Sequence, residues 1–340
     1  MQKKRIAYFD NCKFTLMLLV VVGHFIEQYA PESAIYRSLF LFIYTFHMPA
    51  FFFLSGLFDS PKTGLSRRVN KGVYFISLYV LLKCLITATE WIFTGSYTFT
   101  LFTEKGIPWF CLVLGVYTIL TGVLRRAGMN LKAVLIINII VACFAGLDKS
   151  LGDYLSFSRF LIYYPFYLLG AVVSREKIEA ALKSKLLRAA GYAVVGGYLA
   201  ACCFYIDKLY ILRHVLTGRN AFKDAIMPYG PLIRLACYGL TAVVGFAFLM
   251  IIPRMNLGFI SVFGQRTMQI YFWHMPILHI LCYQNIHMLI PSLGVGGLIL
   301  WALCGAALTF VLALKPFGFP VTQLSRWLQQ KKAYRYNSPA

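Results

Sequence analysis

Long apolar stretches recur from one end of the chain to the other, and they constrain its fold more than any other feature. Each is long enough to cross a hydrocarbon core of about 30 Å as a helix. Because only 13% of the 340 residues are charged and 59% are hydrophobic, the surface of a soluble domain of this length would lack charge. The sequence therefore predicts an all-α protein, a polytopic bundle of transmembrane helices in a cell membrane, most simply a bacterial inner or plasma membrane.

The apolar pattern predicts ten membrane spans. They are expected at residues 12–29, 38–58, 71–93, 107–124, 132–147, 159–174, 189–206, 232–252, 267–290 and 294–314. The first span is followed by no small-residue cleavage site, so we expect a retained helix and not a signal peptide. Residues 1–340 are expected to form a single membrane domain that ends in a basic cytoplasmic tail, 315–340.

The distribution of lysine and arginine predicts the orientation of these spans. If the amino terminus lies inside, the cytoplasmic segments carry 22 of these residues and the opposite segments carry 9. This bias places both termini in the cytoplasm. The same clustering in short loops argues against nucleic acid as a partner, despite a formal charge of +21. The nine cysteines form no CxxC pair, so neither a disulfide framework nor a metal site is expected.

The first span contains ionisable residues, which are expensive inside a membrane and mark a functional site by default. Asp10 and Lys13 are three residues apart and can pair. His24 lies eleven residues beyond Lys13, on the same stripe of the helix and about 16 Å along its axis. Glu27 can accept the second imidazole N–H and fix the tautomer. The structural alternative is that Lys13 extends to the inner headgroups and His24 bonds a neighbouring helix.

The second span repeats this pattern at a matching depth. Counting residues from the boundaries puts His47 about 14 Å below the outer surface and His24 about 18 Å above the inner one. In a core about 30 Å thick the two imidazoles are therefore expected close together. Pro49 removes the hydrogen bond to the Thr45 carbonyl and should kink the helix. Ser55, followed by a glycine, allows another backbone to approach.

Three more residues extend the polar interior. Arg159 begins the sixth span, His274 lies in the middle of the ninth, and Trp109 is expected as an interfacial anchor or a stacking surface. A neutral imidazole at this depth can take a proton from a hydroxyl group that attacks an acyl carbonyl. Because no nucleophile elbow, Walker loop, HExxH or GxGxxG motif is present, the residues favour an acid–base site between helices. A transporter or flippase, and a sensor without catalysis, are the alternatives.

Four segments resemble the acyltransferase-3 family, particularly its branch related to fucose 4-O-acetylases. They are FDNCKFTLMLLVVVGHF, FHMPAFFFLSGLF, SRFLIYYPFYLLG and FGQRTMQIYFWHMPI, which follow the family's order within residues 5–290. The resemblance implies transfer of an acyl group, usually acetyl from cytoplasmic acetyl-CoA, to a hydroxyl of an extracytoplasmic or lipid-linked carbohydrate. It needs no metal.

The resemblance also implies roles for individual residues. His24 matches the family's catalytic histidine, and Lys13 matches a basic residue that engages the donor, although lysine lacks the bidentate phosphate contact of arginine. The expected catalytic set is His24, Lys13 and Asp10, and the expected substrate-binding set is His47, Arg159, His274, Glu27, Trp109 and Ser55. Many relatives carry an extracytoplasmic esterase-like domain that this chain lacks. The chain should complete transfer alone or hand the acyl group to a separate extracytoplasmic transferase; a homo-oligomer is equally compatible.

Overall fold

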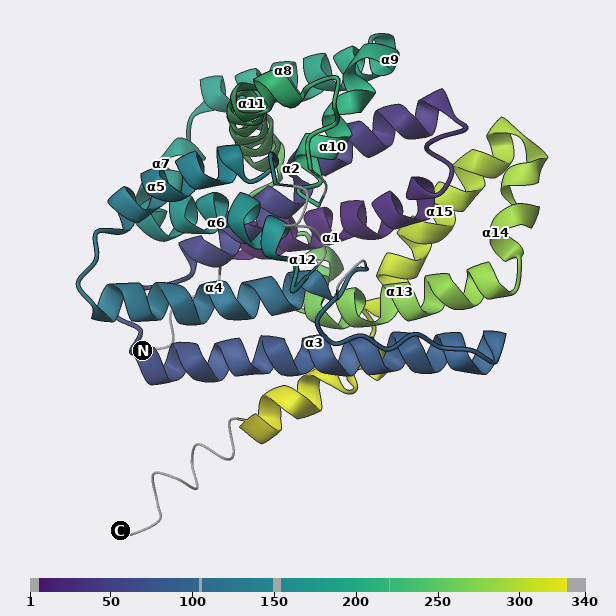
Figure 1. Cartoon of the computed structure of the whole chain (residues 1–340), viewed down its shortest axis with the longest axis horizontal. Helices are drawn as coiled ribbons and strands as arrows, with labels where there is room; N and C mark the ends of the chain where they lie inside the picture. The colour runs from purple at the N-terminus through teal and green to yellow at the C-terminus, as the bar shows by residue number, and fades with distance from the viewer. Residues whose placement is uncertain (1–5, 104–105, 149–153, 220, 329–340) are drawn as a thin grey trace.

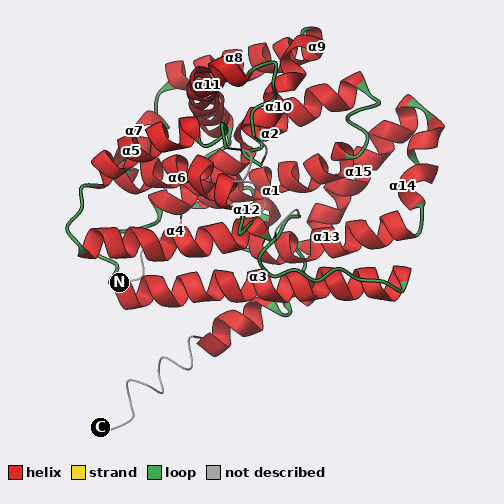
Figure 2. Cartoon of the chain, in the orientation of Figure 1, coloured by secondary structure: helices red, strands yellow, loops and turns green. Residues whose placement is uncertain are grey.

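The computed structural model describes residues 6–103, 106–148, 154–219 and 221–328. Within these ranges the chain is helical or in loops, and an isolated bridge between Thr103 and Tyr154 is the one β contact (Figure 2). The prediction of an all-α fold is confirmed. The expected tail lies only partly within the described residues: 315–328 are described, with a helix at 321–328, whereas 329–340 lie outside, as do residues 1–5.

Among the described residues, ten helices of fourteen residues or more form the body of the molecule, and shorter ones connect them (Figure 1). The long helices are α1 Ala7–Glu27, α2 Ala34–Leu57, α3 Leu65–Thr94, α4 Trp109–Arg126, α5 Leu131–Phe144, α6 Phe157–Val172, α8 Lys185–Phe204, α11 Gly230–Ile251, α13 Thr267–Tyr283 and α15 Val295–Leu312. The short ones are α7 Arg175–Ala181, α9 Ile206–Leu209, η1 Tyr210–Leu212, α10 Arg213–Leu216, η2 Met227–Tyr229, α12 Phe259–Phe263, α14 Ile286–Leu289, η3 Pro291–Leu293 and η4 Lys315–Gly318.

Seven to eight helices of the described chain are candidate membrane spans, fewer than the ten expected. Seven are long and apolar enough by themselves, and α6 joins them only when it is taken with α7, from which it is bent by 86°. The expected span 132–147 is the 14-residue α5, which is short for a crossing. The expected span 267–290 is interrupted because α13 ends at Tyr283 and Asn285 adopts a left-handed conformation with φ of 58°.

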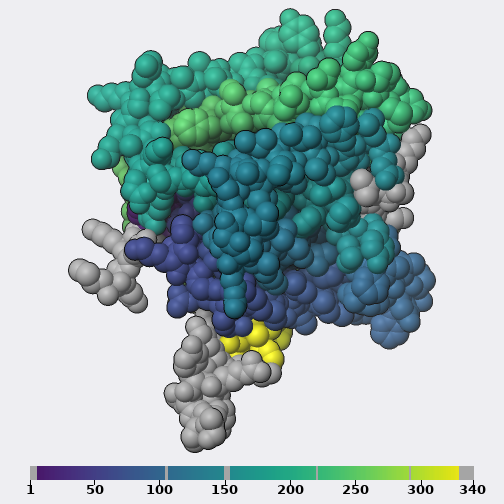
Figure 3. Space-filling view, turned by 60° about the vertical axis from the view of Figure 1, so that its left-hand side comes forward, coloured from purple at the N-terminus to yellow at the C-terminus, as the bar shows by residue number. Residues whose placement is uncertain are grey.

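Helices α1 and α2 form the centre of the bundle. In α2 the apolar window is 78% buried, whereas in α8 at the periphery the share is 11%. α2 packs against α1, α6, α8 and α11, while α1 also contacts α12, α13 and α15. On the face shown in Figure 3 almost none of the purple that marks α1 is visible, because later helices cover it. The helix with the costly ionisable residues is therefore enclosed by protein.

Two glycines bring α2 and α6 into backbone contact. A Cβ added to Gly56 would lie 2.0 Å from the Tyr167 carbonyl oxygen, and one added to Gly170 would lie 2.1 Å from that of Phe53. Small residues at facing positions are how membrane helices reach such short separations, since lipid supplies no hydrophobic drive for association. The sequence predicted a close backbone approach at Ser55 and Gly56, and the approach occurs at Gly56.

Gly170→Val is expected to prevent accumulation of folded protein. The new side chain meets backbone, which cannot turn away, so α2 and α6 must separate along their contact. The measurement is the yield of monodisperse protein in detergent and its Tm. Gly197→Val is the matched control, because a Cβ there meets nothing within 4 Å. Equal yields of the two variants would show that the α2–α6 contact is dispensable.

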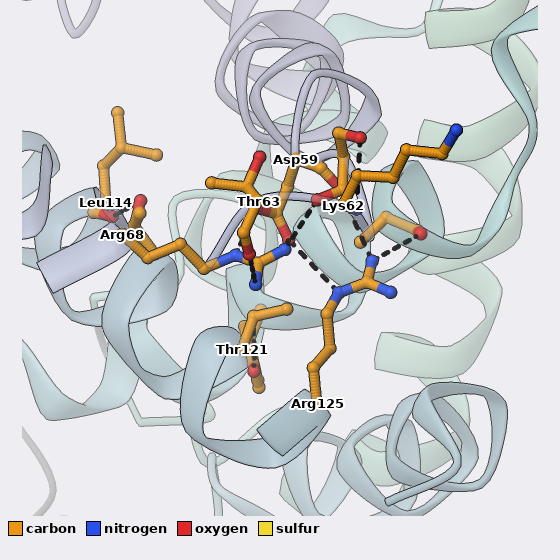
Figure 4. Close-up of polar contacts among 11 residues, drawn as sticks. Asp59, Lys62, Thr63, Arg68, Leu114, Thr121 and Arg125 are labelled. Carbon is orange, nitrogen blue, oxygen red and sulfur yellow. Dashed lines mark hydrogen bonds and ion pairs between the residues drawn. The ribbon is translucent and has the colours of Figure 1, made fainter. Parts of the chain in front are cut away.

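A buried ionic cluster closes the loop between α2 and α3 (Figure 4). The Arg68 guanidinium donates to Asp59 Oδ1 at 2.8 Å and to the Ser60 carbonyl at 2.8 Å. Arg125 of α4 pairs with the same carboxylate at 3.5 Å and donates to the Ala171 carbonyl at 3.0 Å. Because one carboxylate and several carbonyls hold both guanidinium groups, the cluster joins α2, α3, α4 and α6 structurally.

Candidate active site

A cavity of about 380 Å³ is lined by residues of α1, α2, α4, α6, α10 and α13. Its lining comes from the last turns of α1, the first half of α2, and the starts of α4 and α6. The segment 213–219 and Met275 of α13 complete the wall. The cavity is therefore at the end of the bundle opposite the start of α1, and it lies between helices as the sequence predicted.

His24, Glu27 and Tyr44 form a hydrogen-bonded group at the cavity wall. His24 Nδ1 donates to Glu27 Oε2 at 3.0 Å, and Tyr44 Oη donates to the same oxygen at 2.9 Å. The His24–Glu27 contact follows from helix geometry, because residues three apart share a face of α1. Gly23 lets α2 approach, since a Cβ there would lie 3.2 Å from the Tyr44 ring. This arrangement leaves His24 Nε2 with a lone pair.

Two buried histidines flank this group. His47 lines the same cavity as His24, as the depth count predicts, and its Nδ1 donates to the Ile43 carbonyl at 2.7 Å. His274 Nδ1 donates to the Tyr271 carbonyl at 2.7 Å, and its ring centroid lies 5.7 Å from that of His24. Within the described chain His274 Nε2 is buried without a hydrogen-bond partner. Each imidazole is thus fixed through Nδ1, and the group presents Nε2 atoms as acceptors.

Pro49 shapes α2 beside this group. The Thr45 carbonyl, which a residue other than proline at position 49 would bond, accepts a hydrogen bond from Thr241 Oγ1 of α11 at 2.9 Å. The sequence predicted the loss of the backbone bond. The structure adds the residue that replaces it.

Arg159 and Trp109 lie together in the lining of the same cavity. The Arg159 guanidinium lies 4.8 Å from the centroid of the Trp109 ring, and Trp109 stacks on Tyr163 at 5.3 Å. Trp109 and Arg159 stand at the starts of α4 and α6, so both side chains reach the end of the bundle. The electrons of the Trp109 ring attract the Arg159 guanidinium, and this attraction holds the guanidinium in position.

The segment 213–219 supplies residues that the motifs missed. Arg213, His214, Thr217 and Arg219 line the cavity. Burial, together with the charges of Arg213 and Lys223, lowers the pKa of His214. The available signal was the cluster of basic residues in the segment 207–234 between two apolar stretches.

Lys13, Asp10 and Ser55 lie away from this cavity. Lys13 Nζ is 3.7 Å from Asp10 Oδ1 and 4.9 Å from the centroid of the Phe58 ring, at the start of α1. Asp10 is buried, and its backbone packs against Gly264, where a Cβ would lie 1.9 Å from the Asp10 carbonyl oxygen. Ser55 is half-buried near the end of α2. Of the nine predicted site residues, the structure brings six together and leaves these three apart.

The cavity combines an oriented base with cations and aromatic surfaces. His24 has its second nitrogen fixed by a carboxylate, which is the arrangement of a general base. Among the described residues, no three His, Cys, Asp or Glu side chains gather closely enough to hold a metal ion. The fold defines a multi-pass membrane protein, and the cavity between its central helices is lined by histidines, a carboxylate and arginines.

Comparison with known proteins identifies the family. The acyltransferase domain that defines the acyltransferase 3 family matches residues 6–314, and the chain belongs to this family. The nodulation protein NolL of Sinorhizobium fredii is 26% identical over 218 residues, 58% of this chain and 56% of that protein. NolL of Mesorhizobium japonicum is 29% identical over 177 residues, which are 48% of this chain and 46% of that protein. The chain therefore spans about half the length of the curated relatives it matches, and no solved structure matches it.

Proposed function

We propose that this protein transfers an acyl group, most simply acetyl from acetyl-CoA, to a hydroxyl of a cell-surface or lipid-linked carbohydrate. The observation that carries the proposal is the His24–Glu27 pair at the wall of a substrate-sized cavity. Family membership supports acyl transfer as the reaction. We further infer that both termini are cytoplasmic, which the excess of lysine and arginine supports. The cavity then opens away from the cytoplasm.

In the proposed reaction His24 Nε2 takes the proton of the acceptor hydroxyl while its oxygen attacks the thioester carbonyl carbon. A tetrahedral oxyanion forms, and Arg159 is placed to stabilise its charge. The carbon–sulfur bond then breaks, the thiolate recovers the proton from His24, and the acyl ester remains on the acceptor. Glu27 stabilises the imidazolium that exists between the two proton transfers.

The test is transfer of label from acetyl-CoA in membranes with and without the protein, followed by mass spectrometry of the surface glycans. We expect a gain of one acetyl mass at a hydroxyl position. A transporter or flippase would bind a solute in the same cavity, but it would neither bind acetyl-CoA nor transfer its label. Absence of any labelled acceptor in membranes that contain folded protein would contradict the proposal.

Lys13 lies on the donor side in this scheme. It is about 16 Å from His24 along α1, so the flexible arm of the donor would connect a phosphate at Lys13 to a thioester at His24. We expect Lys13→Ala to raise the KM for acetyl-CoA about 10-fold, because it removes a charge-assisted contact, while the acceptor KM stays unchanged. Lys13→Arg should retain or lower the donor KM, because its guanidinium can bind phosphate through two donors.

Two further variants separate donor binding from pairing with Asp10. Lys62→Ala controls for loss of an exposed lysine in the loop after α2. Asp10→Asn removes the pairing partner and retains Lys13. If Asp10→Asn lowers Tm and Lys13→Ala leaves the donor KM unchanged, then Lys13 serves the fold and not the donor.

A further inference from the structure

A small cavity lies beside the candidate active site, and a buried arginine lines it. The cavity has a volume of about 20 Å³, and its lining comes from α2, α6, α10 and α11. Tyr163 lines this cavity and the larger one, so the two cavities are neighbours. A volume of this size holds about one water molecule or one monatomic ion, and it excludes phosphate, sulfate and sugars.

Arg234 of α11 is the charged residue in this lining. Its side chain is 1% exposed, and within the described chain none of its three guanidinium nitrogens has a hydrogen-bond partner. A guanidinium group remains charged at neutral pH, so loss of a proton does not relieve the cost of its burial. Among the described residues that line the cavity there is no carboxylate. A buried charge without an opposite charge is strongly destabilising, and an ion of opposite charge removes much of that cost.

The hydroxyl groups of the lining are engaged elsewhere. Each donates to a backbone carbonyl at 2.8 or 2.9 Å; they belong to Tyr163, Tyr238 and Thr241. The N–H groups of Arg234 are therefore the strong donors that the described lining offers to a ligand. A ligand that accepts several hydrogen bonds from one guanidinium and also balances its charge is an anion.

Phe222 covers the guanidinium group. The guanidinium carbon of Arg234 lies 4.8 Å from the centroid of the Phe222 ring. Two glycines hold this ring in place, since an added Cβ would lie 2.6 Å from it at Gly146 and 2.2 Å from it at Gly230. The Phe222 backbone N–H donates to the Gly146 carbonyl at 2.8 Å. The ring therefore shields Arg234 from water, and the low dielectric around the charge strengthens its attraction for an anion.

We propose that a monatomic monovalent anion, chloride or another halide, binds in this cavity as the counter-ion of Arg234. The ion accepts hydrogen bonds from the guanidinium group and neutralises its charge. Because residues of α2, α6, α10 and α11 surround the cavity, the ion stabilises the contact of these helices beside the larger cavity. None of these contacts involves acyl transfer, so the site is independent of the proposed function.

Two alternatives account for Arg234 without an ion. A water molecule fits the same volume and accepts hydrogen bonds, but it leaves the charge unbalanced. The Cys237 thiol also lines the cavity and would balance the charge if it lost its proton. Neither alternative depends on the salt in the buffer, so the response to chloride distinguishes both from a bound halide.

Thermal unfolding of the purified full-length protein in detergent tests the proposal, with gluconate exchanged for chloride at constant ionic strength. We expect the Tm of the wild type to rise by about 2 to 4 °C in chloride, because a ligand that binds only the folded state stabilises it. Bromide should act as chloride does, whereas gluconate is too large for the cavity. Radioactive chloride should bind to the wild type at about one ion per chain, and bromide should displace it.

Arg234→Met retains the length of the side chain and removes its charge. We expect this variant to lose the difference in Tm between chloride and gluconate. In gluconate it should unfold at or above the temperature of the wild type, because the unbalanced buried charge is gone. Arg254→Met is the matched control, since Arg254 is exposed and outside the cavity, and it should retain the response of the wild type.

The opposite results overturn the proposal. Equal Tm values of the wild type in the two salts, or no saturable binding of radioactive chloride, would show that Arg234 holds no halide. A chloride response that persists in Arg234→Met would place the ion elsewhere. A purely structural role of the stacked guanidinium would lower the Tm of Arg234→Met equally in both salts. If Arg234→Met does not fold, chloride binding to the wild type and to Arg234→Lys, which retains the charge, decides the question.

Discussion

His24→Ala is expected to lower kcat for acyl transfer by about 10²- to 10⁴-fold, the range for loss of a positioned general base. The residual rate would come from binding and from charge stabilisation, which the substitution leaves in place. His24 Nδ1 bonds the side chains of Glu27 and Tyr44 at the cavity wall, and the substitution removes no backbone hydrogen bond. The Tm should therefore remain near that of the wild type, and the measurement is label transfer at matched amounts of folded protein.

His287→Ala is the matched control for this variant. His287 lies in α14 at the same end of the bundle and outside the cavity, and its backbone carbonyl, which Tyr29 bonds, survives the substitution. Near-normal transfer by folded His24→Ala would move the base to His47 or His274, both of which present Nε2 toward this region. Loss of folding in His24→Ala alone would instead support the structural alternative, in which the imidazole bonds a neighbouring helix.

The centre of the site could be predicted because its contacts are local or depend on depth. His24 and Glu27 meet through helical spacing, and His47 reaches His24 because adjacent spans joined by a short loop return to the same depth. Each ionisable residue could be identified as a site candidate because such residues are rare and costly in membrane spans. The same reasoning located Arg159 and Trp109 at the starts of their helices.

The part of the cavity wall formed by residues 213–219 and the number of spans could not be predicted in the same way. Arg213 and Arg219 line the cavity from a connection made of short helices. The path of such a connection cannot be predicted from hydrophobic periodicity, because the segments are too short to show one. In the sequence Tyr44 could not be distinguished from the other aromatic residues of its span. Only the structure shows that its hydroxyl bonds Glu27. Helix α13 ends at Tyr283 because Asn285 adopts a left-handed conformation. A hydropathy average over a long window does not detect a single such residue.

Lys13 shows how helical spacing can place two residues on one stripe of a helix without placing them in one site. The stripe that contains Lys13 and His24 exists, but the residues are separated by the length of three helical turns and only His24 reaches the cavity. One helix therefore connects two polar regions, at opposite ends of the bundle. In the proposed scheme these regions serve the two substrates separately.

Glu27→Gln is expected to reduce kcat by about 10²-fold or more while the KM values for both substrates change little, because Glu27 acts on His24 and not on the ligand. The carboxylate accepts from His24 Nδ1–H at 3.0 Å, so it holds the tautomer that leaves Nε2 free and stabilises the imidazolium. Glutamine can instead donate to Nδ1 and favour the unproductive tautomer. Glu32→Gln removes an exposed charge from the following loop and should leave kcat unchanged. An increase in acceptor KM with normal kcat would show that Glu27 binds the acceptor and that His24 obtains its orientation elsewhere.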